Sequence, residues 1–515
     1  MRQDNALDGA RRAFLKQLGA GTAVISMPAF LAGCATFPAI PLSEPVPENP
    51  FLTWFGVDEQ LLARVMSELT ANGATLADLY FQHARNEHLR LEDGVAAAPQ
   101  ISIEQGAGLR VVNNGQTGFV ATEVLTAEGL LAAARDAAAI ATGSAAPAPS
   151  RFAILPGNDS YPVKTHWTDV SLDRRWHILE QVTECARTAD SSVASVTVDW
   201  QDADERILIA TLDGNLVTDR RPLTRLSVQV EVQRGAERHS GFASVSARRG
   251  VEWFARERLD ELAKTAVERA LVRFDARRPP LGEMPVVLAA GTSGIVLHEA
   301  LGHALEADFS EPGGGPYAGR LGEQVAATFV SVIDDATMPH ERGALNTDDE
   351  GIAGQRNVLI ENGILKSFLH DRTTAAAAGV APTGSGRRES FRYAPQPRMS
   401  CTFIANGTDT RDDVLDAAGR GVLVETYSDG KVDPRTGDFS FRIRNGSFIE
   451  GGKARYPLRD LTLHGNGPSL LANVQRLAND GRMDAAGWTC GKRGQRVPVS
   501  HGMPTALVGG LTIGD

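Results

Sequence analysis

Apolar residues follow helical and strand periods in turn along this chain, and the alternation predicts a mixed α+β fold. The first half combines apolar residues at helical spacing with segments that alternate apolar and polar residues, as half-buried strands do. Two such strands meet at Asp213-Gly214, a dipeptide typical of antiparallel hairpins. We therefore expect N-terminal helices with an antiparallel sheet, the helices covering about residues 61–69, 126–142, 172–189 and 252–273.

The second half begins with an apolar run at 284–289 and a Gly/Thr/Ser turn. Apolar residues at helical spacing follow, which predicts a buried strand that enters a helix with Thr292 or Ser293 as N-cap. Most later segments are short β runs, so we expect a mostly antiparallel or barrel-like sheet that includes this helix. Expected local features are hairpin turns at Asn362-Gly363 and Asn445-Gly446, a long loop at 373–400 and a helix at about 467–479.

Proline-rich stretches divide the chain into parts. With 515 residues, of which 42% are hydrophobic, the chain is long enough for more than one core. The segment DARRPPLGE at 275–283 interrupts the helical pattern and predicts a domain boundary. The expected parts are a targeting segment (1–34), a Pro-rich tether (35–52), an N-terminal α+β domain (53–278) and a C-terminal domain (279–515).

The first residues are typical of an export signal. RRAFLK, which contains Arg11 and Arg12, resembles the twin-arginine export signal, and the apolar stretch that follows is too short to span a bilayer. It ends in LAGC, which resembles a bacterial lipobox with Cys34 as the lipidated residue. We expect export by the twin-arginine route and a periplasmic protein anchored to a membrane by lipid. A signal peptide cut near Ala35 and a chance arginine pair in a cytoplasmic protein are the alternatives.

The net charge of the chain limits the kinds of partner that we expect. The net charge of -11 argues against a nucleic-acid backbone as partner, because phosphate binding needs a basic surface.

His298, Glu299 and His303 form the chemical signal of the expected helix. Two imidazoles can bind a metal, and a neighbouring carboxylate can take a proton from metal-bound water. The histidines are five residues apart, about 140° around an ideal helix, so an ideal helix does not bring both to one metal. A single-turn π-bulge or a kink can absorb the extra residue and restore a shared face, and Gly302 would ease it. The plain alternative is that His298 faces solvent or the core while His303 caps a neighbouring group.

Several segments resemble one known family. HEALGHALEAD, DDEG at 348–351, TGSGRRES at 383–390, PRMS at 397–400, VDPRTGDFSF at 432–441 and CGKRGQRVPV at 490–499 are similar to the TldD/PmbA family of zinc metallopeptidases. The order and spacing match over about residues 55–515. In that family the TldD type has the metal motif and the PmbA type lacks it, so this chain resembles the catalytic type.

The resemblance implies a site and partners. It implies Zn²⁺ held by His298 and His303, with Glu299 as general base. A catalytic zinc usually has three protein ligands, and the family's third is Cys490 of CGKRGQ. Cys401 is the competitor, and Glu306 or Asp308 is the fallback. The implied substrates are short or unfolded peptides, and the implied assembly is a homodimer or a heterodimer with a PmbA-like subunit. A noncatalytic lipoprotein that binds peptides or scaffolds such a subunit is the alternative.

Overall fold

The computed structural model describes residues 50–515, except 141, 156, 311, 312 and 434. The expected export signal, the lipidation site Cys34 and most of the expected tether lie outside the described residues. Within the described part, no helix is both long enough and apolar enough to cross a lipid bilayer.

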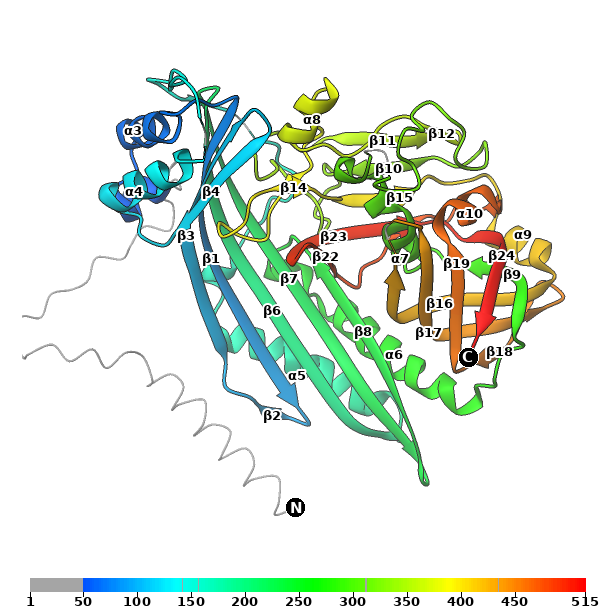
Figure 1. Ribbon diagram of the computed structural model, residues 1–515. Helices are drawn as coiled ribbons and strands as arrows, with labels where there is room; N and C mark the ends of the chain where they lie inside the picture. Colours follow the sequence, from blue (N-terminus) through cyan, green and yellow to red (C-terminus); the bar gives the residue numbers. More distant parts are fainter. Residues whose placement is uncertain (1–49, 141, 156, 311–312, 434) are drawn as a thin grey trace, which may run out of the picture. The chain divides into compact units, whose positions relative to one another are not determined.

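One long antiparallel sheet organises the first half of the chain (Figure 1). The strand order is β4-β3-β1-β6-β7, with β8 next to β7 along most of its outer side and β2 next to β1. The hairpin turn at Asp213-Gly214 is confirmed, with Gly214 at a φ of 80°. The strands are β1 (Leu76–Glu92), β2 (Val95–Ala96), β3 (Gln100–Asn113), β4 (Gln116–Thr122), β5 (Ala153–Ile154), β6 (Val193–Thr211), β7 (Asn215–Arg234) and β8 (Glu237–Ala247).

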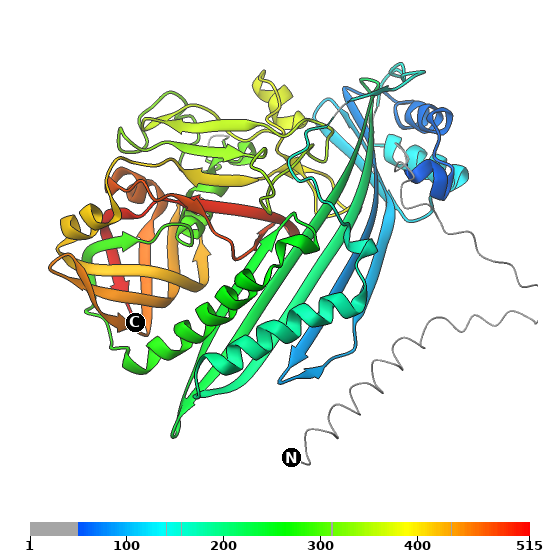
Figure 2. The ribbon, with the colours of Figure 1, turned by 180° about the vertical axis from the view of Figure 1, so that it is seen from behind.

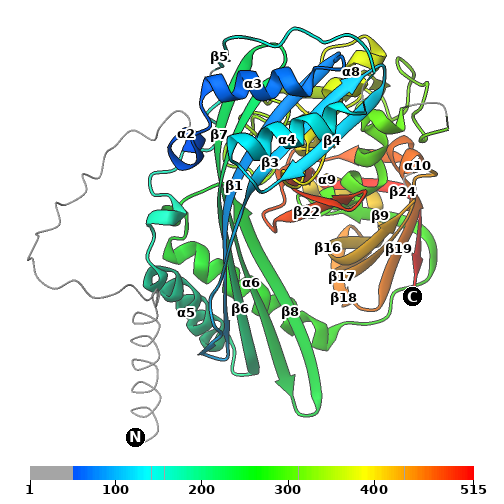
Figure 3. The ribbon, with the colours of Figure 1, turned by 60° about the vertical axis from the view of Figure 1, so that its left-hand side comes forward.

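Helices pack on this sheet in two pairs. α3 and α4 contact β1, β3 and β4, whereas α5 and α6 run along β6, β7 and β8 (Figures 2 and 3). Side-chain caps explain where several begin: Asp58 accepts from the backbone N of Leu61, and Ser171 from that of Arg174. The elements are α2 (Pro50–Phe55), α3 (Glu59–Leu69), α4 (Ala127–Ala138), α5 (Leu172–Ala189), α6 (Arg256–Leu271) and the 3₁₀ turns η1 (Trp167–Asp169), η2 (Val251–Trp253) and η3 (Val272–Asp275).

The second half contains a barrel and a separate sheet. The barrel closes in the order β16-β9-β24-β19-β17 and back to β16, so the prediction of an α+β fold with a barrel-like sheet is confirmed. The other sheet has the order β12-β11-β10-β15-β23-β21, with β22 paired to β23. The strands are β9 (Gly282–Leu288), β10 (Val332–Asp335), β11 (Arg356–Glu361), β12 (Ile364–Leu365), β13 (Gly386–Arg387), β14 (Gln396–Pro397), β15 (Cys401–Ile404), β16 (Arg420–Val432), β17 (Asp438–Glu450), β18 (Lys453–Leu458), β19 (Leu461–Asn466), β20 (Val474–Leu477), β21 (Arg482–Met483), β22 (Trp488–Lys492), β23 (Gln495–Met503) and β24 (Ala506–Gly514).

Short helical elements connect these strands, and one of them lies at the centre. α7 contacts β15 and β23 on one side, while the turn that continues it contacts β16 and β17 of the barrel. The helix with the two histidines is therefore held between the barrel and the second sheet. The elements are α7 (Gly294–Leu297), η4 (His298–Gly302), η5 (His303–Leu305), η6 (Ala307–Phe309), α8 (Arg372–Ala378), α9 (Arg411–Ala418) and α10 (Gly467–Ala472).

Three local predictions are corrected. The prediction of a turn at Asn445-Gly446 is wrong, because β17 continues through both residues. A Cβ on Gly446 would lie 2.8 Å from the carbonyl O of Leu423, so the glycine permits close strand pairing. The helix at 467–479 is wrong beyond Ala472, where β20 pairs with β24 instead. The loop at 373–400 includes most of α8 and the short strands β13 and β14.

Candidate metal centre

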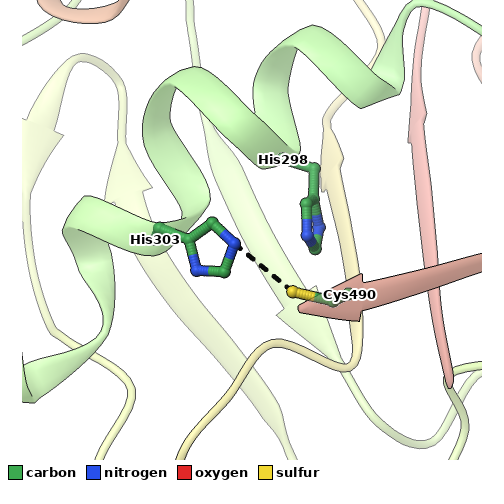
Figure 4. Close-up of side chains that lie close together, drawn as sticks. All are labelled: His298, His303 and Cys490. Carbon is green, nitrogen blue, oxygen red and sulfur yellow. Dashed lines mark hydrogen bonds between the residues drawn. The ribbon is translucent and has the colours of Figure 1, made fainter. Parts of the chain in front are cut away.

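The expected helix is present and has the irregularity that its histidine spacing requires. β9 leads through a turn into α7, and residues His298–Gly302 then form a single π-helical turn before a 3₁₀ turn at His303–Leu305. The wider turn absorbs the extra residue, so both imidazoles point to the same side, with ring centroids 5.2 Å apart (Figure 4). Ser293 is the N-cap residue, but its hydroxyl makes no cap bond and instead accepts from the Tyr427 hydroxyl at 2.9 Å.

Glycines let this helix approach its neighbours closely. A Cβ on Gly302 would lie 2.0 Å from Sδ of Met399, and one on Gly294 would lie 2.5 Å from the backbone N of Gly502. Gly302 therefore permits the close packing of the π turn against the 397–400 segment, while its own backbone, with φ of -55°, is ordinary helix.

Cys490 supplies the third donor. It lies in β22, which forms a hairpin with β23, and its Sγ is 3.3 Å from Nε2 of His303. One ligand atom from each of His298, His303 and Cys490 lies within 4.8 Å of the others, and all three side chains are buried. Tetrahedral zinc with Zn–S of about 2.3 Å and Zn–N of about 2.0 Å would separate sulfur and nitrogen by roughly 3.5 Å.

His298 supports this fit. Both of its ring nitrogens are buried and have no hydrogen-bond partner among the described residues. A buried imidazole without any partner is costly, whereas a metal ion would use one nitrogen directly. The donor set of two imidazoles and one thiolate suits zinc, and a catalytic zinc held by three protein ligands would bind water or substrate as well.

Glu306 orients His303 and is not free to act as the third ligand. The Glu306 side chain is fully buried and accepts from Nδ1 of His303 at 2.9 Å, which directs Nε2 towards Cys490. The same carboxylate lies 2.9 Å from Nζ of Lys492 and 3.3 Å from the backbone N of Met399. A carboxylate behind a ligating histidine fixes its tautomer and raises its basicity. Asp308 is likewise engaged, at 2.7 Å from Nζ of Lys492.

The electrostatics favour a thiolate at Cys490. Burial would raise its pKa, but the neighbouring imidazoles of His298 and His303 lower that pKa from 9.0 to about 5. Burial would lower the pKa of His303, but Glu306 and Cys490 raise it well above 6.5. Burial also opposes ionisation of Glu306, yet His303 and Lys492 lower its pKa to about 2. Without a metal, a proton on His303 balances the thiolate, and a divalent cation can replace that proton.

The other cysteines lie elsewhere. Cys401 is fully buried in an apolar cluster with Tyr161 and Ala344, and burial raises its pKa well above 9.0. Cys185 lies on α5, where it contacts the carbonyl O of Asp260. Neither Cys401 nor Cys185 belongs to the group of ligand atoms formed by His298, His303 and Cys490.

Glu299 is the least buried member of the motif. It follows His298 directly and is half-buried, whereas the three donors are buried. A general base needs access to the attacking water, so the difference in burial suits this role.

Sequence reasoning did not find His501, which lies behind His298. The two ring centroids are 5.9 Å apart, and Trp488 packs 5.3 Å from His501 on its other side. Both ring nitrogens of His501 are buried without a hydrogen bond in the described part of the chain, and Oδ2 of Asp484 is 3.6 Å from Nε2. Burial lowers the pKa of His501, which favours a neutral ring beside the metal ligands. A histidine inside a strand is no signal by itself, so only the tertiary structure identifies it.

Two buried imidazoles and a thiolate are a donor set that can hold a catalytic metal ion. The chain belongs to the PmbA/TldD metallopeptidase family. Three domain models match it, described as PmbA/TldA metallopeptidase domain 1 (77–141), central domain (165–274) and C-terminal domain (281–515).

Two relatives that are similar in sequence are named metalloproteases. A metalloprotease TldD homolog of Haemophilus influenzae is 34% identical over 90% of this chain and 98% of its own length. A zinc metalloprotease TldD homolog of Saccharolobus solfataricus is 32% identical over 50% of this chain and 57% of its own. TldE of Thermococcus kodakarensis, at 17% identity, has the same fold with a TM-score of 0.66 over 88% of this chain and 99% of that one.

Proposed function

We propose that this protein is a zinc-dependent peptidase in which His298, His303 and Cys490 hold the metal and Glu299 is the general base. The observation that supports it most is the meeting of these three donors, two from the π-bulged helix and one from a strand 187 residues later. The thiolate and two neutral imidazoles leave a zinc site with net positive charge. Family membership and the names of the relatives support the reaction class.

The chain's own groups divide the work. Zinc bound here would polarise the scissile carbonyl and lower the pKa of a water molecule towards about 7. Glu299 accepts a proton from the attacking water and then donates it to the leaving amine. Glu306 holds His303 in the tautomer that presents Nε2, and the buried surroundings keep the donors fixed.

The proposed substrates are short or unfolded peptides, bound through their backbone. β8 pairs only with β7 among the described strands, and Phe242–Val245 on it line a cavity of about 680 Å³. The backbone N of Ser246 points away from β7, at the edge of the sheet, and donates to the carbonyl O of Ala485. Ser244 lies two residues earlier in the strand, so its backbone N and carbonyl O also point away from β7. An extended peptide that adds to such an edge is selected for its backbone and not for its sequence.

The test is Glu299→Gln, which keeps shape but cannot accept the proton. We expect zinc content to remain and peptide cleavage to fall by about 10²–10⁴-fold. Glu361→Gln, an exposed position at the end of β11, is the control and keeps full activity. Undiminished cleavage by Glu299→Gln would exclude this base, and a purified protein without zinc that binds peptides would favour the noncatalytic alternative.

We also propose that the protein is exported by the twin-arginine route, lipidated at Cys34 and paired with a second copy or a PmbA-like subunit. The support is the RRAFLK and LAGC segments and the family to which the chain belongs. Replacing Arg11 and Arg12 together by Lys should abolish membrane delivery, measured by cell fractionation. Cys34→Ala should abolish labelling by a lipid precursor, and labelling that persists would contradict the proposed anchor.

A further inference from the structure

The cavity of about 680 Å³ beside β8 is rich in arginine. Its walls come from the outer edge of β8, from α6, from the turn before α7 and from the 482–488 segment that leads into β22. Two carboxylates, those of Glu261 and Asp484, belong to the lining. Five guanidinium groups face them, from Arg225, Arg258, Arg269, Arg444 and Arg482.

These arginines lack the partners that this protein provides for others. Among the described residues, none of the five lies within 4.0 Å of a carboxylate, whereas Arg110 lies 2.6 Å from Asp78 and 2.5 Å from Glu350. The cavity arginines instead use neutral groups. Arg258 lies over the ring of Trp253 at 4.4 Å, and Arg269 donates to the carbonyl O of Phe242 at 2.9 Å.

Arg225 is the least satisfied of the set. Its Nε is buried and has no hydrogen-bond partner within the part of the chain that the structure describes. Burial lowers the pKa of Arg225, Arg269 and Arg444, which shows that nearby carboxylates do not compensate for lost hydration. The charge of Asp484 opposes this shift at Arg269, but Asp484 also accepts from Nε1 of Trp488 at 2.7 Å and from the backbone N of Ala486 at 3.1 Å. Four half-buried guanidinium groups and the exposed one of Arg482, none of them paired with a carboxylate among the described residues, favour the binding of an anion.

The cavity lies next to the metal centre. Trp488 is in its wall and precedes Cys490 by two residues on β22. From Trp488, His501 is 5.3 Å away, and His501 is 5.9 Å from the ligand His298. His501 is fully buried between Trp488 and His298, so a peptide residue held in the cavity would not be the residue at the scissile bond.

We propose that this arginine-lined cavity binds a carboxylate of the peptide, so that the enzyme prefers peptides with Asp, Glu or a free C-terminus at the residue that occupies the cavity. This inference deepens the proposed function and rests on it. A guanidinium group can bind a carboxylate through two parallel hydrogen bonds. In this cavity no internal carboxylate among the described residues already occupies those donors.

The experiment measures peptide binding to zinc-loaded Glu299→Gln by fluorescence anisotropy. The labelled peptides share one sequence except at the residue expected to occupy the cavity, which is Glu, Gln or Lys. Each peptide is made with a free or an amidated C-terminus. We expect the Glu peptide to bind about tenfold more tightly than the Gln peptide, and the Lys peptide more weakly than both, with the difference reduced by salt. A preference that follows the free terminus and not the Glu would assign the carboxylate to the chain end.

Variants locate the effect. Arg225→Gln and Arg444→Gln, each added to Glu299→Gln, should reduce the preference for Glu several-fold, whereas Arg225→Lys should retain part of it. Arg442→Gln is the matched control, because Arg442 lies two residues before Arg444 on β17 but is exposed and outside the cavity lining. Equal binding of Glu and Gln peptides, or a preference that survives the Arg225→Gln and Arg444→Gln changes together, would overturn the inference. Cleavage of unlabelled peptides by the unmodified enzyme is scored separately, so failure of catalysis and failure of this preference are distinguished.

Discussion

Replacing Glu306 by Gln tests whether the buried carboxylate behind His303 sets the strength of metal binding. The amide preserves the volume, but it removes the negative charge that lies 2.9 Å from Nδ1 of His303 and 2.9 Å from Nζ of Lys492. The imidazole then has a neutral amide in place of a charged acceptor, and among the described residues Asp308 is left as the close charged partner of the buried Lys492.

The expected magnitude follows from the position of Glu306. Loss of a carboxylate behind a metal-binding histidine typically weakens metal affinity by about 10–100-fold. That range corresponds to about 1.4–2.7 kcal/mol. Because Glu306 is fully buried and accepts from three donors, we expect a value towards the upper end.

Competition with a coloured zinc chelator at neutral pH measures the affinity. Glu323→Gln is the control, since Glu323 pairs with Arg320 at 2.9 Å on the exposed surface, and its loss should leave zinc binding unchanged. Far-UV circular dichroism of both variants establishes that the fold is retained, and Glu306→Asp tests whether a shorter carboxylate restores part of the affinity. Zinc affinity within twofold of the unmodified protein in folded Glu306→Gln would refute this role.

The same substitution predicts a pH dependence for the metal-free protein. The pKa of Glu306 falls from 4.5 to about 2 on folding, so its stabilising contribution is complete above 4.5 and is lost as pH falls towards 2. The raised pKa of His303 makes its contribution complete below 6.5 and lost at higher pH. The stability difference between the unmodified protein and Glu306→Gln, measured by urea unfolding, should therefore be largest between about pH 4.5 and 6.5.

The remaining predictions concern the thiols. Cys490→Ser should lose most of its zinc on dialysis while Cys401→Ser retains it, and elemental analysis of the two side by side decides between them; the reverse result would assign the third ligand to Cys401. In the metal-free protein, the ultraviolet absorbance of the thiolate should show a transition near pH 5, because the imidazoles lower the pKa of Cys490 despite its burial. That transition should disappear in Cys490→Ser and persist in Cys401→Ser; a first transition only near pH 9 would contradict the described electrostatics.

Local interactions explain what the sequence by itself determined. The segment 172–189 is a helix with the expected bounds, because Ser171 caps it and its apolar residues share one face. Asn362-Gly363 forms a turn in which both residues adopt the left-handed backbone, with φ of 49° and 82°, and at Asp213-Gly214 the glycine adopts it, with φ of 80°. The five-residue spacing of the histidines likewise required a π turn, since no other regular helix brings both rings to one side.

Only the tertiary structure decided the features that depend on distant residues. Asn445-Gly446 has the same dipeptide signal as Asn362-Gly363, yet pairing with strands on both sides keeps it extended. Spacing alone left the third donor open, and packing of β22 against the helix brings Cys490 to within 3.3 Å of His303 while Cys401 lies in a separate apolar cluster. The orienting role of Glu306 and the unpaired arginines of the cavity also result from contacts between residues far apart in sequence, which periodicity and spacing along the chain do not encode.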